Sequence, residues 1–351
     1  MAAERITDSE SPRILIVRLS AIGDVIQSMP IACALRERFP QAFLAWAGAG
    51  RAADLLQGHP ALDELIVLAR GWLKSPHAVL ALRRRLREIG FDVAIDAQGL
   101  TKSAMVGWLS GAPRRLGFGD AWGRELSRWL NNELVETVGP HVIQRNLQLL
   151  GPLGVQSPAV RFDVPEHAID RAAADVMVRQ AGFERGFAII NPGAGWPSKL
   201  WPLDRYAAVA RHLDRSWRLP TLVVWAGDEE RAMADWIVED AVGAARTAAP
   251  TTLPQLAALA RRARLVVGSD TGPLHLAAAV GTPCVGLYGP WPAERHGPYG
   301  PQHVLVQKMV LEGSTRQRRK ASLMYMEAID VESVCQACDR VLVNRRTMGA
   351  A

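Results

Sequence analysis

The chain has 351 residues, 49% of them hydrophobic and 22% charged, which excludes a disordered or fibrous protein and suits two α/β domains of ordinary size. Its formal net charge of +6 and pI near 9.4 indicate an anionic partner, without choosing among a phosphorylated small molecule, a nucleic acid and an acidic membrane surface. The first ten residues, MAAERITDSE, lack the apolar stretch of a signal peptide, so we expect a cytoplasmic protein.

Apolar segments alternate with helical patterns through the first half of the chain. The expected strands are 13–19, 42–48, 62–69 and 93–99, and a helix from about Val25 to Phe39 follows the first of them. Strands this apolar, separated by amphipathic helices, are typical of a parallel sheet that is covered on both faces.

A second series of the same kind fills the other half. Glycine and proline interrupt the periodicity at 151–167, and strands are then expected at 187–191, 221–227, 264–270 and 284–289. The sequence therefore predicts two α/β domains, at about 12–160 and 165–328. In such sheets the ligands bind at the carboxyl ends of the strands.

The segment RLVVGSDTGPLHLAAAVGTP offers the first candidate site. A strand ends near Gly268, a turn follows at 269–272, and Pro273 suits the start of a helix. Such a turn directs backbone N–H groups and the positive end of the helix at one point, which suits a phosphate. An ordinary helix cap is the alternative, because Ser, Asp and Thr are favoured there in any case.

A second candidate site is NPGAGWPSKLWP, residues 191–202. Its glycines let a ligand approach the backbone, and Lys199 supplies a point charge for a diphosphate, although the order of residues is not that of a Walker A loop. A plain loop is the alternative. Because both turns lie in the same half of the chain, together they favour a nucleotide-diphosphate site.

The turn RLSAIGDVIQSMP, residues 18–30, places Asp24 after the first strand. No G-x-G-x-x-G sequence follows that strand, which disfavours a dinucleotide-binding enzyme. Taken alone, Asp24 is best interpreted as an acid favoured by the helix dipole. If the second domain binds a nucleotide, however, Asp24 is a candidate general base.

Four segments taken together resemble a known family. RILIVRLSAIGDVIQSMP, FDVAIDAQGLTKSA, PSKLWP and VVGSDTGPLHLAAAVGTP are similar to sequences of the lipopolysaccharide heptosyltransferases of glycosyltransferase family 9, of the heptosyltransferase I type. The resemblance runs from about Arg13 to Pro298. It implies a GT-B fold, in which two Rossmann-like domains with parallel sheets face an interdomain cleft. It also implies that a last helix, at 329–345, packs back on the first domain.

The resemblance further implies an inverting transfer of heptose from an ADP-activated donor to an anionic glycolipid acceptor, with no cofactor and no metal. Asp24 corresponds to the family's general base. Residues of the second domain correspond to donor-binding positions: Ala194, Gly195, Ser198, Lys199, Asp228, Thr251, Asp270, Thr271, Gly272 and His275. Four basic residues correspond to acceptor-binding positions: Arg18, Arg70, Lys74 and Arg124. The alternative for these four is a role as surface salt-bridge partners, and for His275 it is a buried structural histidine.

Two departures from the family pattern keep another nucleotide sugar open as the donor. The loop GAGWPSK lacks the hydroxyl side chains that heptosyltransferase I places on the phosphates, and Thr251 stands where a larger apolar residue is usual. The basic segment 312–324 is interpreted as a mobile loop or as a contact with an anionic acceptor or with the inner-membrane surface.

Other classes of protein fit the sequence less well. No nucleic-acid-binding motif occurs, and a single Asp-Thr-Gly triplet between a strand and a helix does not suit an aspartic protease. Cys335 and Cys338 form a lone C-x-x-C, so no metal site is expected. A non-catalytic protein that binds nucleotide sugars is the remaining alternative, and the presence of Asp24 with Lys199 and His275 disfavours it.

Overall fold

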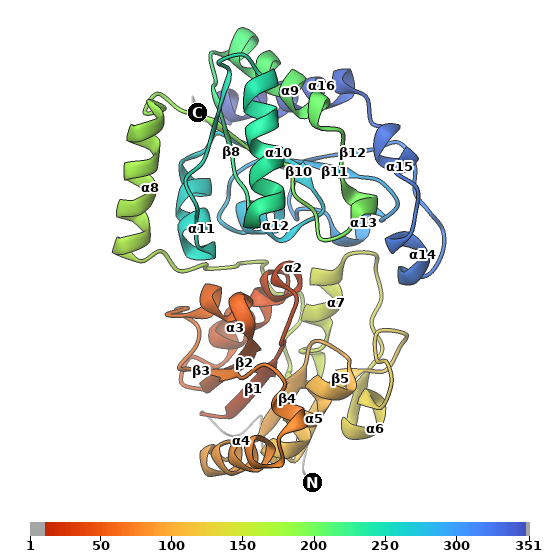
Figure 1. Ribbon diagram of the computed structural model, residues 1–351. Coiled ribbons are helices and arrows are strands. Elements are labelled where there is room, and N and C mark those ends of the chain that lie inside the picture. Colours follow the sequence, from red (N-terminus) through yellow and green to blue (C-terminus); the bar gives the residue numbers. More distant parts are fainter. Residues whose placement is uncertain (1–10, 349–351) are drawn as a thin grey trace. The chain divides into compact units, whose positions relative to one another are not determined.

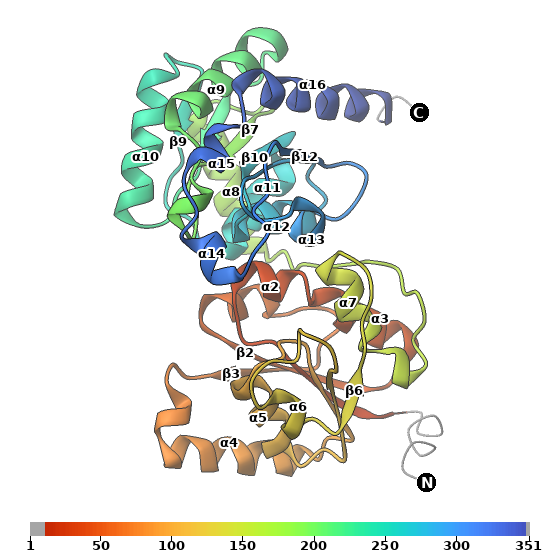
Figure 2. The same cartoon turned by 90° about the vertical axis from the view of Figure 1, so that its right-hand side faces the viewer.

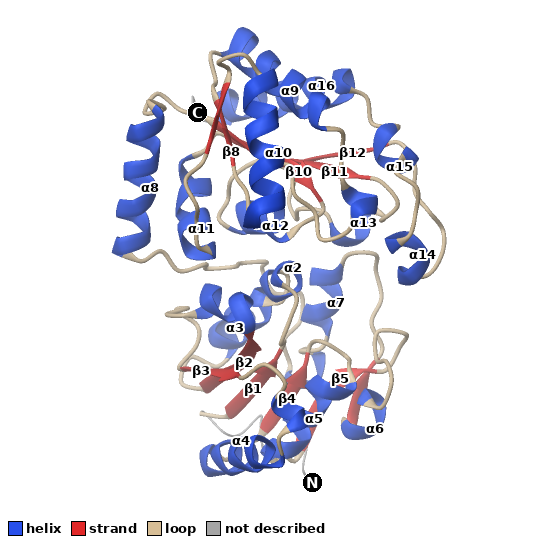
Figure 3. Cartoon of the chain, viewed as in Figure 1, coloured by secondary structure: helices blue, strands red, loops and turns tan. Residues whose placement is uncertain are grey.

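The chain folds into two compact units that divide between Pro165 and Glu166, inside the Gly- and Pro-rich segment 151–167. The structure is a computed structural model that describes residues 11–348. Figure 1 shows the course of the chain, and Figure 3 shows that each unit combines a sheet with surrounding helices. The expectation drawn from residues 1–10 lies outside the described residues.

Unit 1 is built on a six-stranded sheet whose strand pairs are all parallel, in the order β3-β2-β1-β4-β5-β6. The strands are β1 (Arg13–Val17), β2 (Phe43–Ala49), β3 (Glu64–Leu68), β4 (Val93–Asp96), β5 (Arg114–Phe118) and β6 (Glu133–Val135). Strands β1 and β4 are buried almost throughout because helices cover both faces of the sheet, which explains their continuous apolar sequences.

The helices of unit 1 connect these strands. They are α2 (Ile22–Ile26), α3 (Met29–Arg38), α4 (Pro76–Ile89), α5 (Thr101–Ser110), α6 (Ser127–Leu130) and α7 (Val142–Gln148), with 3₁₀ turns η1 (Gly50–Leu56), η2 (Trp72–Lys74) and η3 (Gly151–Leu153). The single helix expected from Val25 to Phe39 is wrong in one respect, because it is broken at Gln27 and Ser28. Pro30 lies in the first turn of α3, where its missing N–H costs no helical hydrogen bond, whereas a continuous helix would lose one there.

Unit 2 repeats the architecture with the strand order β12-β11-β10-β7-β8-β9, again with every pair parallel. The strands are β7 (Ala188–Asn191), β8 (Thr221–Val223), β9 (Ala245–Thr247), β10 (Leu265–Ser269), β11 (Cys284–Tyr288) and β12 (Val304–Gln307). Both units therefore confirm the expected α/β class and the two Rossmann-like domains. Each is a doubly wound parallel sheet.

The helices of unit 2 are α8 (Ala168–Ala181), α9 (Leu203–Trp217), α10 (Gly227–Asp240), α11 (Leu253–Arg262), α12 (Gly272–Ala279), α13 (Ala293–His296), α14 (Thr315–Arg319), α15 (Met324–Glu327) and α16 (Val331–Met348), with the 3₁₀ turn η4 (Pro197–Lys199). The basic segment 312–324, for which a mobile loop was one interpretation, forms α14 and leads into α15. Among the described residues, none of the helices is both long and apolar enough to cross a membrane.

The last helix belongs to unit 2. Helix α16 packs against α9 and the β10–β12 side of the sheet, as Figure 2 shows for α9. Its apolar residues, Val334, Ala337, Cys338, Val341 and Leu342, are buried in the core of that unit. The structure thus differs from the expected packing of this helix on the first domain, because its apolar stripe is already covered by the sheet that precedes it in the sequence.

Candidate active site

The strand order of unit 2 points to one place on its sheet. Strand β7 lies between β8, which follows it in the sequence, and β10, so the direction of strand addition reverses between β7 and β10. At such a switch point the loops after the two strands diverge and leave room for a ligand at the carboxyl ends. The segment 192–199 follows β7, and the segment 270–275 follows β10. These are the two segments in which the sequence predicted a phosphate site.

Lys199, Asp270 and His275 form a buried cluster across this switch point. The Lys199 Nζ atom lies 2.5 Å from Asp270 Oδ2 and also donates to the Asp270 carbonyl oxygen at 3.1 Å. The His275 Nε2 atom lies 3.0 Å from Asp270 Oδ1. An ammonium group carries three N–H donors, and these contacts use two of them, so one donor of Lys199 remains for a ligand oxygen.

The charges around Asp270 keep its carboxyl group ionised. Burial alone would raise its pKa, but the hydrogen bond from His275 and the positive charge of Lys199 outweigh burial and hold the pKa far below its usual range. Only 9% of the Asp270 side chain and 14% of the Lys199 side chain are exposed. The cluster is therefore a fixed ion pair rather than two independent surface charges.

A second pair of contacts joins the same two segments. The Asn191 side-chain amide, at the end of β7, donates to Thr271 Oγ1 at 3.2 Å and to the Gly193 carbonyl oxygen at 3.2 Å. Helix α12 then begins at Gly272, and no side chain caps its N-terminus. The hydroxyl of Ser198 is fully buried and has no hydrogen-bond partner among the described residues. Polar groups held in this way can serve an anionic ligand.

The loop after β7 is open next to Lys199. Gly195 is exposed, and a side chain placed there would meet no atom within 4 Å, while Ala194 is half-buried. Of the ten donor-binding residues that the resemblance implied, eight thus lie on the two segments, 192–199 and 270–275, that this cluster connects.

Asp228 and Thr251 are not brought into this cluster. Asp228 is exposed in the first turn of α10, after β8, and Thr251 is half-buried before α11, after β9. Glu230, which the sequence analysis missed, lies closer to the loop after β7: its carboxyl group packs against Gly193, where a side chain would collide with it. Burial raises the pKa of Glu230, which accepts a hydrogen bond from the Ala226 backbone at 2.8 Å. Residues two positions apart on a helix face different directions, so the local sequence could not show which of Asp228 and Glu230 faces the loop after β7.

Unit 1 has its own switch point, between β1 and β4, and Asp24 lies on the loop and helix that follow β1. Its Oδ1 atom pairs with Arg18 Nη2 at 3.0 Å, and its Oδ2 atom accepts the Ala21 backbone N–H at 3.1 Å. Its side chain is 39% exposed. Asp24 is therefore a carboxylate whose direction is fixed and which solvent can still reach.

Arg18 lies behind Asp24. Its side chain is 8% exposed, and its guanidinium group also donates to the carbonyl oxygen of Ala97, directly after β4. The adjacent Leu19 backbone N–H donates to Gln98 Oε1 at 2.8 Å. The structure thus places Arg18 as a salt-bridge partner of Asp24, which is the alternative to direct contact with an acceptor.

The three other residues that correspond to acceptor-binding positions are exposed. Arg70 follows β3, Lys74 ends η2, and Arg124 precedes α6, where its backbone N–H donates to the Gly99 carbonyl oxygen at 2.9 Å. Within the described part of the chain, no acid lies at ion-pair distance from any of the three, unlike Arg18. Their side chains are accessible to an anionic ligand.

The sequence model of glycosyltransferase family 9 (heptosyltransferase) matches residues 79–326, which is most of the chain and includes the whole Lys199–Asp270–His275 cluster. The chain belongs to glycosyltransferase family 9. It is therefore an enzyme, a glycosyltransferase, as the four sequence segments indicated. The match begins after Asp24, so the role of this residue depends on other arguments.

Individual relatives support the same assignment. The chain is 29% identical over 304 residues to lipopolysaccharide heptosyltransferase 1 of Pseudomonas aeruginosa, which covers 83% of this chain and 82% of the relative. The solved structure of the family 9 glycosyl transferase from Veillonella parvula superimposes with a TM-score of 0.82 at 23% identity, covering 95% and 98% of the two chains. The E. coli heptosyltransferase WaaC, solved with ADP-2-deoxy-2-fluoro heptose, superimposes with a TM-score of 0.73 at 24% identity, covering 93% and 99%. At these identities the two solved structures show the fold.

Two tryptophans next to the Lys199–Asp270–His275 cluster were missed by the sequence analysis. Lys199 Nζ lies 4.7 Å from the centroid of the Trp291 ring, which comes from the loop after β11. Trp196 immediately precedes η4 and is 38% exposed. A signal was present in the sequence, because both tryptophans occur in Trp-Pro pairs in the loops that follow apolar strands, but nothing in either segment alone brings them to Lys199.

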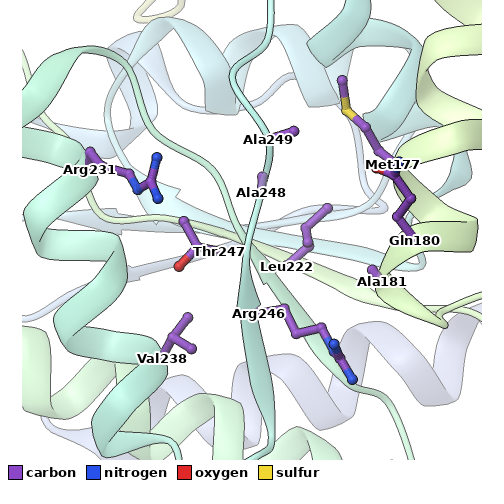
Figure 4. Close-up of a pocket in the computed structure, with 10 residues that line it drawn as sticks. All are labelled: Met177, Gln180, Ala181, Leu222, Arg231, Val238, Arg246, Thr247, Ala248 and Ala249. Atoms are coloured by element: carbon purple, nitrogen blue, oxygen red, sulfur yellow. The ribbon is translucent and has the colours of Figure 1, made fainter.

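A separate pocket of about 470 Å³ lies elsewhere on unit 2, beside the edge strand β9 and between α8 and α10 (Figure 4). It is lined by Met177, Gln180, Ala181, Leu222, Arg231, Val238, Arg246, Thr247, Ala248 and Ala249. None of the expected donor-binding residues lines it, so we base the site on the switch-point cluster instead. Over the described residues, no group of three or more His, Cys, Asp or Glu side chains is arranged to hold a metal ion.

Asp270→Asn should change how stability depends on pH. Because the pKa of Asp270 is depressed in the folded protein, its stabilising effect is complete above its unfolded-state pKa, near 4, and is lost as the pH falls below that value. We expect the free energy of unfolding to decrease less between pH 6 and pH 3 in the variant than in the wild type. Urea unfolding at the two pH values measures this, and equal decreases would contradict the ion-pair interpretation.

Proposed function

We propose that this family 9 enzyme transfers a heptose, with inversion at the anomeric carbon, from ADP-heptose to a hydroxyl group of an anionic lipopolysaccharide inner-core acceptor. The observation that carries the proposal is the Lys199–Asp270–His275 cluster at the switch point of unit 2, beside an uncapped helix N-terminus. The lipopolysaccharide heptosyltransferases among the relatives, and the solved complexes of WaaC with ADP and with ADP-2-deoxy-2-fluoro heptose, support the choice of donor.

In this mechanism the Asp24 carboxylate takes the proton of the acceptor hydroxyl as its oxygen attacks the anomeric carbon. The bond from that carbon to the diphosphate oxygen breaks at the same time, and ADP leaves with the bonding electron pair. Arg18 acts as a positioning residue, because its ion pair with Asp24 at 3.0 Å fixes the direction of that carboxylate. The inverted product follows from attack on the face opposite the leaving group.

The leaving diphosphate gains negative charge as the bond breaks, and the donor site is suited to that charge. The third N–H donor of Lys199 and the N-terminal amides of α12 are fixed before the reaction, so little reorganisation is needed when charge develops. We assign the nucleoside to the loops after β8 and β9, where Asp228, Glu230 and Thr251 lie. This arrangement supplies positive charge from the chain's own residues.

We assign the anionic acceptor to Arg70, Lys74 and Arg124, which are exposed residues of unit 1. Lysine and arginine bind phosphate and carboxylate groups well when no protein acid competes for them. Because such an acceptor is a glycolipid, we place the reaction at the cytoplasmic face of the inner membrane, with peripheral contact between the protein and the lipid surface. The net charge of +6 favours that contact.

Thermal unfolding with nucleotides tests the donor site. A ligand that binds only the folded state raises the midpoint of unfolding, so ADP and ADP-heptose should each raise it by several degrees at saturating concentration. UDP and GDP serve as matched diphosphate controls and should raise it less. No shift with any nucleoside diphosphate would contradict the donor assignment.

Mass spectrometry of the reaction products tests the sugar that is transferred. The purified enzyme is incubated with an inner-core acceptor and, separately, with ADP-heptose and other nucleotide sugars. We expect the mass of one heptose to be added from ADP-heptose. Transfer of a different sugar, with no transfer from ADP-heptose, would replace the donor and leave the family assignment intact.

A further inference from the structure

Helix α14 packs against η4, the turn that carries Lys199. Its segment, 312–324, contains one acid, Glu312, and four basic residues, Arg316, Arg318, Arg319 and Lys320. Ser314 caps the helix and forms a capping box with Gln317, so the short helix has a defined start. The basic segment is therefore part of unit 2 next to the proposed donor site.

Two of its arginines lie over tryptophans of that site. The guanidinium carbon of Arg319 lies 4.1 Å from the centroid of the Trp196 ring, and that of Arg318 lies 5.8 Å from the centroid of the Trp291 ring. The Lys199 Nζ atom also lies over the Trp291 ring, 4.7 Å from its centroid. Lys199 and Arg318 thus share one aromatic ring, which brings their positive charges close together.

These contacts occupy the faces of the arginines and leave their N–H edges available. The Nε atom of Arg318 donates to the Leu311 carbonyl oxygen at 3.0 Å, which fixes the side chain and leaves its two terminal nitrogens. Within the described residues, no acid lies at ion-pair distance from Arg318 or Arg319. An arginine that is held over a ring and has a free edge suits bidentate binding of a phosphate.

The backbone that supports this arrangement is also fixed. The Gln307 side chain donates to the carbonyl oxygens of Gly289 and Trp291, at 2.8 Å and 2.7 Å, and the Leu311 backbone N–H donates to Pro290 at 3.2 Å. The indole Nε1 atom of Trp291 is buried without a hydrogen-bond partner among the described residues. The loop after β11 and the segment before α14 are therefore joined to each other.

We propose that Arg318 and Arg319 are further phosphate-binding residues of the donor site and contact the distal phosphate of the nucleoside diphosphate, the one that bears the sugar. The inference rests on the proposed function. The order of strands in the sheet indicates the direction in which the donor lies. The nucleoside is assigned to the loops after β8 and β9, and Lys199 and Asp270 lie at the carboxyl ends of β7 and β10. Helix α14 follows β12, on the opposite side of β7 and β10 from β8 and β9. A diphosphate that extends from the nucleoside past Lys199 presents its distal phosphate toward the α14 side.

Titration calorimetry of ADP and AMP with the full chain tests the proposal. Arg318→Gln and Arg319→Gln should each weaken ADP binding about tenfold, because a charge-assisted hydrogen bond to phosphate is lost. AMP, which lacks the distal phosphate, should bind with less than about a twofold change. Arg316→Gln and Lys320→Gln are matched controls, since both residues are exposed basic residues of the same segment, and they should bind ADP as the wild type does.

Each other outcome has a defined meaning. The Arg319 side chain donates no hydrogen bond to the protein within the described residues, so Arg319→Gln should fold normally even if Arg318→Gln does not, and thermal unfolding verifies this. Unchanged ADP affinity in Arg319→Gln overturns the proposal, as does equal weakening of ADP and AMP. If the substitutions change only the KM of the acceptor, these arginines bind the acceptor instead of the donor, and the proposal is likewise overturned. A wild-type protein that binds no nucleoside diphosphate overturns the proposed function first and this inference with it.

Discussion

Asp24→Asn should bind the donor with wild-type affinity and lose transfer by a factor of about 10² to 10⁴, the usual contribution of a general base. Asparagine has almost the same shape, and its carbonyl oxygen can still accept the Ala21 backbone N–H that Asp24 Oδ2 now accepts. It cannot take the proton from an acceptor hydroxyl. The measurement is the single-turnover rate with saturating donor, together with the affinity for ADP from calorimetry.

The chain contains a close control for this variant. Asp63 pairs with Arg36 at 2.6 Å, accepts the Leu44 backbone N–H at 2.7 Å and is 41% exposed, so its surroundings are very similar to those of Asp24. Asp63→Asn loses the same kind of ion pair at the amino end of a strand, remote from the loops that follow β1. It should lose stability to a similar degree and keep its transfer rate. Full transfer by Asp24→Asn would return Asp24 to the role of a structural acid favoured by the helix dipole.

The sequence predicted the inner strands of both sheets except β5, and of the four edge strands it predicted only β3. Eight apolar segments predicted β1 to β4, β7, β8, β10 and β11, and all eight are strands. The strands that were missed are β5, β6, β9 and β12, which lie toward the edges of the two sheets. Edge strands are short or carry charged residues because one side meets solvent, as in ELV for β6 and ART for β9. Strand β5, RRLGF, is an inner strand between β4 and β6, and its two arginines interrupt the apolar pattern. Periodicity alone cannot separate such segments from loops.

The candidate site shows a similar limit. The turn at 269–272 and Lys199 were each identified from local sequence, because glycine, proline and hydroxyl residues between a strand and a helix have local meaning. The ion pair between Lys199 and Asp270 joins residues 71 positions apart, and it exists because β7 and β10 are neighbours. Packing between distant segments likewise decides that Glu230, not Asp228, lies against Gly193. It also decides which tryptophans lie under Arg318 and Arg319, and the sequence does not show which segments pack together.

Lys199→Met should weaken ADP binding by about 10- to 100-fold, since one charge-assisted hydrogen bond to the diphosphate is lost, and should lower the transfer rate as well. It should also destabilise unit 2 by about 3 kcal/mol, because Asp270 is 9% exposed and keeps its charge without its ammonium partner. Calorimetry and urea unfolding measure the two effects. Lys308→Met is the control, since Lys308 pairs with Asp330 at 3.2 Å on the surface and should change neither quantity appreciably.

The two effects of Lys199→Met have to be separated, because an unstable site can also bind poorly. Asp270→Asn removes the buried charge, so the double variant should regain most of the stability that Lys199→Met loses. Comparing the ADP affinity of Asp270→Asn with that of the double variant isolates the ammonium, since neither contains the ion pair. If Lys199 holds the diphosphate, Asp270→Asn binds ADP more tightly than the double variant. Equal affinities would mean that Lys199 serves only to neutralise Asp270, and the diphosphate would then depend on the amides of α12.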